Sequence, residues 1–110
     1  MNEKDKILIT HIVAAIDKIE EYTYDIDENT FMRNTLIEDA VIRQIMIIGE
    51  AARHVSKEIV HQFPAVPWKD IVGMRDKLIH GYFGVDTIAV WKTVQEDIPQ
   101  LKVQFKKIWR

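Results

Sequence analysis

The sequence contains no cysteine and little that interrupts a helix, with only 4 Gly and 3 Pro among its 110 residues. The absence of cysteine excludes disulfides, thiolate zinc sites, iron-sulfur clusters and a cysteine nucleophile. The low glycine and proline content, with 47% hydrophobic and 29% charged residues, excludes collagen-like and disordered chains. We therefore expect one compact domain over residues 1–110, whose chemistry depends on nitrogen and oxygen groups.

Long hydrophobic runs and an excess of one charge are also absent. No apolar run approaches the roughly 20 residues of a membrane-spanning helix, and the chain begins with the polar MNEKDK. We expect a cytoplasmic protein without membrane contact. The net charge is -2, but residues 1–39 hold ten acids and four bases, whereas residues 40–110 hold seven acids and eleven bases. An anionic ligand should therefore prefer the second half of the chain.

Apolar residues recur at intervals of three and four, the spacing that places them on one side of an α-helix. The pattern predicts helices at about 4–24, 35–62 and 67–80, and a last helix that Asp86 caps and Pro99 bends or briefly interrupts. No segment alternates apolar and polar residues between turn signals, so we expect no sheet. The predicted fold is an all-α, up-and-down bundle of four to five helices.

The helix predicted at 35–62 has one unusual region, VIRQIMIIGEAA, in which apolar residues cover most of the circumference. Such a helix is central to the fold or lies at a contact between subunits. Gly49 within it costs about 1 kcal/mol of helix propensity relative to alanine. We interpret Gly49 as a place where another backbone packs closely against the helix.

Groups that suit phosphodiester chemistry are concentrated in residues 73–83. Arg75 offers a planar set of donors for phosphate oxygens, and His80 exchanges protons near neutral pH. Asp76 follows the arginine, and Tyr82 lies two residues beyond the histidine. Arg75 and His80 are five residues apart, about 140° around an ideal helix. One copy therefore does not direct both groups at the same point, unless the last turn frays or a second subunit contributes.

The pattern Arg75-x-x-x-x-His80-x-Tyr82, with the Ile48-Gly49-Glu50-Ala51-Ala52 element in the longest helix, resembles the HEPN ribonucleases, specifically the HepT toxin family. The resemblance implies a homodimer in which two copies of the motif face each other and cleave RNA without a metal or other cofactor. It also implies a nucleotidyltransferase antitoxin of the MntA type, which attaches AMP to Tyr82. Arg75 and His80 would then be catalytic and Asp76 would support them.

Structural interpretations compete with these roles. Arg75 with Asp76 or Asp70 is also compatible with an ordinary surface ion pair, and His80 with a residue that complements a helix C-terminus. Tyr82 is equally compatible with a core or interface aromatic residue. A catalytically silent helical module that binds a nucleotidyltransferase or a nucleotide is the second hypothesis, and a purely structural dimer is the third.

Glu50, Arg53 and His54 suggest a metal or catalytic site at first sight. Glu-x-x-x-His is not the Glu-x-x-His pair of di-iron bundles, however, and a second such pair is missing. We expect no metal there. We expect instead that Glu50 pairs with Arg53, with Arg43 or with a base of a partner, and that Glu50 and Gly49 support the site or an interface. The tryptophans are expected to pack in the fold rather than to stack on bases.

Overall fold

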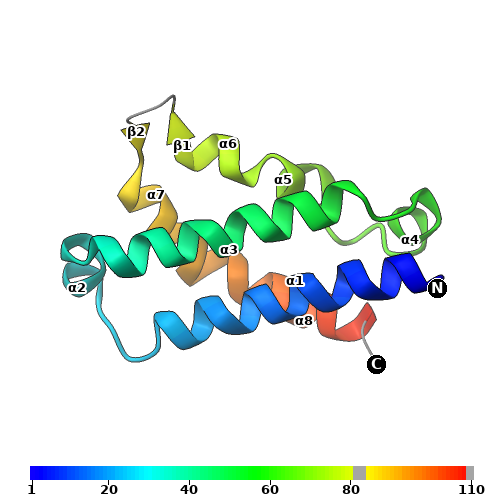
Figure 1. Ribbon diagram of the computed structural model, residues 1–110, viewed down its shortest axis with the longest axis horizontal. Helices are drawn as coiled ribbons and strands as arrows, with labels where there is room; N and C mark the ends of the chain where they lie inside the picture. The colour runs from blue at the N-terminus through cyan, green and yellow to red at the C-terminus, as the bar shows by residue number, and fades with distance from the viewer. Residues whose placement is uncertain (81–83, 109–110) are drawn as a thin grey trace.

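The computed structural model describes residues 1–80 and 84–108, and of His80 the backbone alone. The fold is an all-α bundle built around two long antiparallel helices, α1 (Glu3–Tyr22) and α3 (Thr35–Arg53), which lie side by side in Figure 1. The short helix α2 (Glu28–Arg33) connects them at one end, and α4 (Lys57–Gln62) lies at the other. The predicted bundle is thus confirmed.

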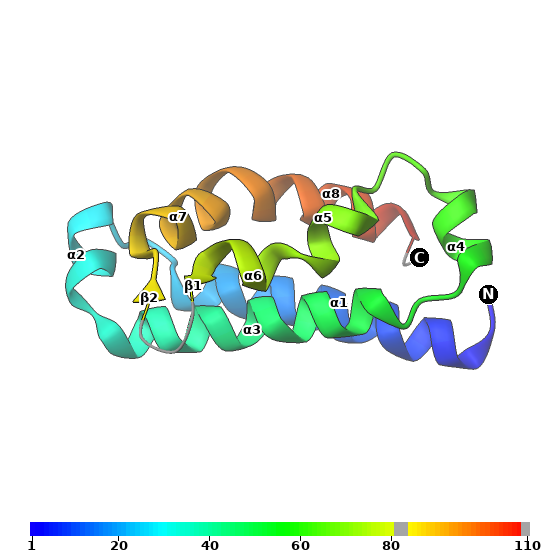
Figure 2. The same ribbon diagram turned by 90° about the horizontal axis from the view of Figure 1, so that it is seen from above.

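The second half of the chain covers the α1–α3 pair. Helices α5 (Trp68–Val72) and α6 (Met74–Leu78) run along α3, as Figure 2 shows. A continuous helical segment then returns past α1 and consists of α7 (Thr87–Lys92), a π-helical turn (Thr93–Asp97) and α8 (Ile98–Ile108). The central position expected for the apolar helix is confirmed for α3, because α1, α2, α5, α6 and α7 all contact it.

Isoleucine dominates the core between these helices. Most residues with at most 1% of their surface exposed come from α1, α3 and α8, namely Ile9, Ile12, Ile16, Ile19, Val41, Ile45, Ile48, Ile98 and Phe105, and α2 and α7 add Phe31 and Val90. Burying a side chain of this size stabilises the fold by about 1.5–3 kcal/mol. Trp68 packs edge-on against Phe105, and Trp91 packs against Phe31 at 5.1 Å between ring centroids. The packing role expected for these two tryptophans is confirmed, while Trp109 lies outside the described residues.

The prediction of a single helix over 35–62 is wrong beyond Arg53, because α3 ends there and α4 is a separate helix. Ser56 caps α4, because its Oγ accepts a hydrogen bond from the backbone N–H of Ile59 at 3.4 Å. The buried carboxyl group of Asp5 accepts two more bonds, from the backbone N–H of Ser56 at 3.0 Å and from its Oγ at 2.6 Å. These bonds hold the turn against the start of α1.

The helix predicted at 67–80 also differs from the structure. It breaks at Gly73 into α5 and α6, and it ends at Leu78. The expectation of no sheet is wrong for a short antiparallel pair, β1 (Ile79–His80) and β2 (Gly84–Val85), in which His80 pairs with Gly84. This hairpin is too short to show the period-two pattern on which the prediction relied.

The last helix begins as predicted, since Asp86 accepts a hydrogen bond from the backbone N–H of Ala89 at 3.0 Å. The irregularity expected from Pro99 occurs just before it, as the π-helical turn. In a regular α-helix the proline ring would clash with the carbonyl of Gln95, and the wider turn relieves that clash.

Within residues 1–80 and 84–108, none of the helices combines the length and the apolar character needed to cross a bilayer.

Candidate functional site

Arg75 and Asp76 project from α6 into solvent. Met74 and Leu78 are buried on the same short helix, so they fix its orientation and turn the residues between them outward. The Arg75 guanidinium contacts Asp76 through Nη1 and Oδ1 at 3.2 Å, and the two side chains are 49% and 79% exposed. The contact uses one arm of the guanidinium, which leaves donors for a phosphate group.

Two more predicted site residues, His80 and Tyr82, follow α6 in the sequence. The backbone of His80 lies in β1, only two residues beyond the end of α6. The backbone N–H of Asp86 donates to the carbonyl of Leu78 at 2.9 Å, which returns the chain to the end of α6. The side chain of His80 and the whole of Tyr82 lie outside the described residues, so their proposed roles stay predictions.

A second polar group lies on α3. Glu50 contacts Arg53 at 3.8 Å between Oε2 and Nε, and His54 at 3.2 Å between Oε1 and Nε2. All three side chains are more than half exposed. The predicted pairing of Glu50 with Arg53 is therefore confirmed, and the pairing with His54 was not expected. Exposed pairs of this kind contribute at most about 1 kcal/mol, so they orient the side chains more than they stabilise the fold.

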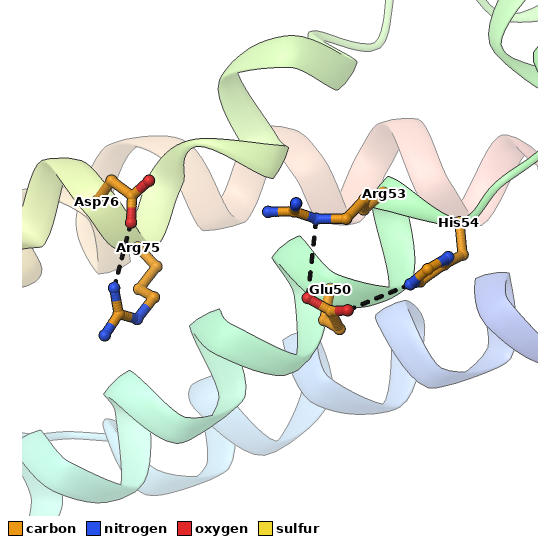
Figure 3. A network of polar contacts seen from close by, with 5 residues as sticks. All are labelled: Glu50, Arg53, His54, Arg75 and Asp76. Atoms are coloured by element: carbon orange, nitrogen blue, oxygen red, sulfur yellow. Dashed lines mark hydrogen bonds and ion pairs between the residues drawn. The ribbon is translucent and has the colours of Figure 1, made fainter.

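Figure 3 shows how these groups lie relative to one another. Arg53 projects from α3 toward the side on which α6 carries Arg75 and Asp76, and Glu50 lies below it on the surface of α3. Two guanidinium groups from helices distant in sequence thus share one face of the molecule. That face belongs to the second half of the chain, where the charge distribution predicted an anionic ligand.

Gly49 lets α5, the helix that leads into α6, pack closely against α3. A Cβ atom at this position would lie 3.3 Å from the carbonyl oxygen of Ile71 and 3.5 Å from that of Val72, at the end of α5. Any larger residue would press against backbone, which cannot turn aside as a side chain can. The predicted close approach of another backbone is therefore confirmed. It sets the distance between the α3 group and α6, which carries Arg75.

A cavity of about 340 Å³ opens on another side of α6, where Met74, Lys77 and Leu78 line it but Arg75 and Asp76 do not. Arg75 therefore lies on an exposed surface of the chain and does not line this cavity. Across residues 1–80 and 84–108 there is also no cluster of three or more His, Asp or Glu side chains suited to a metal ion.

The family model described as ribonuclease HepT-like matches residues 12–108. A "Putative RNase" of Methanocaldococcus jannaschii is 46% identical over 93% of this chain and 94% of its own length. The "Probable ribonuclease HepT" of Thermococcus cleftensis is 44% identical over 98% of both chains. A "Putative RNase" of Caldanaerobacter subterraneus is 39% identical over 91% of this chain and 89% of its own.

No solved structure matches the chain significantly. The family match nevertheless covers most of the chain, including α3 with Gly49 and Glu50 and the whole segment that contains Arg75 and His80. The relatives are matched over nearly their full length. The chain belongs to the HepT-like ribonuclease family.

Proposed function

We propose that this protein is a metal-independent endoribonuclease and the toxin of a HEPN/MNT toxin-antitoxin system. The observation that carries the proposal is an exposed Arg75, oriented by Asp76 and followed five residues later by His80, in a chain of the HepT-like ribonuclease family. The proposed substrate is RNA, and its cleavage takes place in the cytoplasm. Arg53 supplies a second guanidinium group on the same face, beside Glu50, and contacts the RNA backbone next to the cleaved bond.

The reaction uses the 2'-hydroxyl of the RNA as the nucleophile. One His80 removes its proton as the general base, and a second His80 protonates the leaving 5'-oxygen as the general acid. Each of these proton transfers accelerates the reaction by about 100- to 10,000-fold. Arg75 neutralises the charge that develops on the pentacoordinate phosphorus, and the carboxylate of Asp76 keeps the guanidinium in place.

This scheme requires two copies of the chain, because one copy supplies a single histidine and a single arginine of the motif. The exposure of Arg75, at 49% of its side chain, supports a site completed by a partner. Met46 lies one turn before Glu50 on α3 and exposes 42% of its surface, which suits an apolar contact between copies. We propose a homodimer with both motifs in one shared groove.

RNA cleavage in EDTA tests the catalytic proposal. Wild-type protein should release 2',3'-cyclic phosphate or 3'-phosphate ends, while His80→Ala abolishes cleavage and Arg75→Ala lowers it by roughly 100-fold or more. His61→Ala and Lys77→Ala are matched controls, because they remove an imidazole and a cation elsewhere and should leave cleavage intact. Stable folding with no turnover by the wild type would favour the binding-module hypothesis instead.

The antitoxin proposal concerns Tyr82. A nucleotidyltransferase partner of the MntA type would transfer AMP to its phenolic oxygen, and the added phosphate would pair with Arg75 and block the groove. Coexpression with a nucleotidyltransferase encoded beside the gene should increase the mass by units of AMP. Tyr82→Phe should abolish the increase, and Tyr24→Phe, at an 82% exposed tyrosine, should not. An unchanged mass of the wild type would contradict the modification.

A further inference from the structure

The cavity on the other side of α6 has the composition of a binding site. Its inner surface is apolar and buried, and consists of Ile71, Met74, Leu78 and Leu101. Polar residues from α5, α6, the π-helical turn and α8 surround the opening. Its volume of about 340 Å³ lies at the lower end of the range for small-molecule sites. Turns of π-helix, such as the one that forms part of this wall, are frequent at functional sites.

The charges at the opening favour a cation. Asp70 and Asp97 contribute two carboxyl groups, and Lys77 contributes one ammonium group. Lys77 Nζ lies 3.9 Å from Asp70 Oδ1, so it offsets the charge of Asp70 first. Partial desolvation, and then the charge of Glu96, raise the pKa of the exposed Asp97, and the charge of Lys77 opposes this rise. The negative charge of Asp97 therefore remains incompletely compensated within the described part of the chain.

The hydrogen-bonding groups point to a ligand that donates. Gln104 lines the cavity, and its Nε2 donates to the carbonyl of Ala65 at 3.0 Å. Its Oε1 is buried and accepts no hydrogen bond from any described residue. An acceptor left without a donor costs about 1–3 kcal/mol. An N–H group in the cavity would supply the donor after a small turn of the amide.

We propose that this cavity binds a small organic cation in which an ammonium group is joined to a flat apolar body. The ammonium group pairs with Asp97 and Asp70 at the opening, and the apolar body lies on Met74, whose thioether packs well against aromatic rings. A nucleotide fits less well, since its phosphate would approach two carboxylates. The site is separate from Arg75 and does not depend on the proposed cleavage of RNA.

Tryptamine and indole-3-acetate make a matched pair of probes, because they share the indole ring and carry opposite charges. Titration of the full-length, isotope-labelled protein by NMR should show tryptamine shifting amides of α6, the π-helical turn and α8, with a Kd of about 1 mM for a ligand of this size. Indole-3-acetate should bind at least about tenfold more weakly. Shifts outside these elements, or equal binding of the two probes, would overturn the proposal.

Two variants that should change tryptamine affinity in opposite directions test which charges at the opening act on the ligand. Asp97→Asn should weaken tryptamine binding by about three- to tenfold, and Lys77→Gln should strengthen it by about threefold, because the opening becomes more negative. Asp39→Asn removes the same charge as Asp97→Asn at a surface position on α3 and should leave binding unchanged. Binding that is insensitive to Asp97→Asn, or that responds equally to Asp39→Asn, would overturn the site. Asp97 and Lys77 are exposed, so neither substitution should disturb folding.

Discussion

Replacing Gly49 tests how the fold positions Arg75. Alanine adds one carbon 3.3 Å from the carbonyl oxygen of Ile71, a tight contact that a shift of a few tenths of an ångström relieves. It also gains about 1 kcal/mol of helix propensity over glycine. These effects oppose each other, so Gly49→Ala should change the free energy of unfolding by less than about 1 kcal/mol. Valine adds two further carbons against the same backbone, and overpacking of this kind costs about 1–3 kcal/mol.

Urea unfolding followed by circular dichroism measures the free energy of unfolding of each variant and of the wild type. An m-value equal to that of the wild type shows that the folded and unfolded states being compared are the same. Ala14 is exposed on α1 and serves as the control position. Comparing Ala14→Gly with Ala14→Val gives the effect of exchanging glycine for valine on an exposed helix surface. There valine should be the more stable of the two by a few tenths of a kcal/mol. At position 49 the order should be reversed. If Gly49→Val is as stable as wild type, α5 does not pack on α3 as described.

The same displacement should also affect the proposed reaction. Helix α5 leads directly through Gly73 into α6, so pushing α5 away from α3 moves Arg75 relative to its partners. Gly49→Val should therefore lose most RNA cleavage at temperatures where circular dichroism shows it fully folded. A displacement of about 1 Å from a productive geometry costs on the order of 100-fold in rate. Full activity of the folded variant would mean that α5 does not set the position of Arg75.

Three further results are expected. Asp5→Ala leaves the backbone N–H of the partly buried Ser56 without its acceptor and should lower the free energy of unfolding by about 1–3 kcal/mol in urea melts, and a smaller loss would contradict the role of this contact. In an inactive background, Arg53→Ala should reduce the slope of log Kobs for RNA against log salt by roughly 1, and an unchanged slope would remove Arg53 from the RNA surface. The hydrogen bond from the backbone N–H of Thr30, and then that from its side chain, lower the pKa of Asp27. The cap therefore stabilises α2 fully at pH values above the ordinary aspartate pKa, and this stabilisation is lost as the pH falls through the lowered pKa. NMR titration of the Asp27 carboxyl group measures that pKa.

Much of the bundle could be predicted from the sequence, because long helices that bury one side carry a strong period. The stripes of α1, α3 and the last helix have that period, and Gly49 was identified because its cost in a helix needs a reason. The break after Arg53 was missed, because buried apolar residues keep a helical spacing beyond the end of α3, at Val55 and Ile59. Only the cap at Ser56 signals the break, and its contact with Asp5 spans 51 residues of sequence.

The candidate site shows the same division between local and distant information. The contact of Arg75 with Asp76 and that of Glu50 with Arg53 join near neighbours, and both were anticipated from spacing. Neither spacing nor composition indicates that Arg53 and Arg75 share a face, because this depends on how α5 packs on α3. The cavity beside Lys77 was missed for the same reason. Its walls come from segments that only the tertiary fold brings together.

A subunit-mixing experiment tests directly whether each site needs the motif from both chains. Wild-type and His80→Ala proteins would be mixed in varying ratios, allowed to exchange subunits, and assayed for RNA cleavage in EDTA. If two His80 side chains serve one site, activity follows the square of the wild-type fraction, so an equal mixture retains about a quarter of the activity. Activity that falls in direct proportion to the wild-type fraction would show that each chain cleaves RNA on its own.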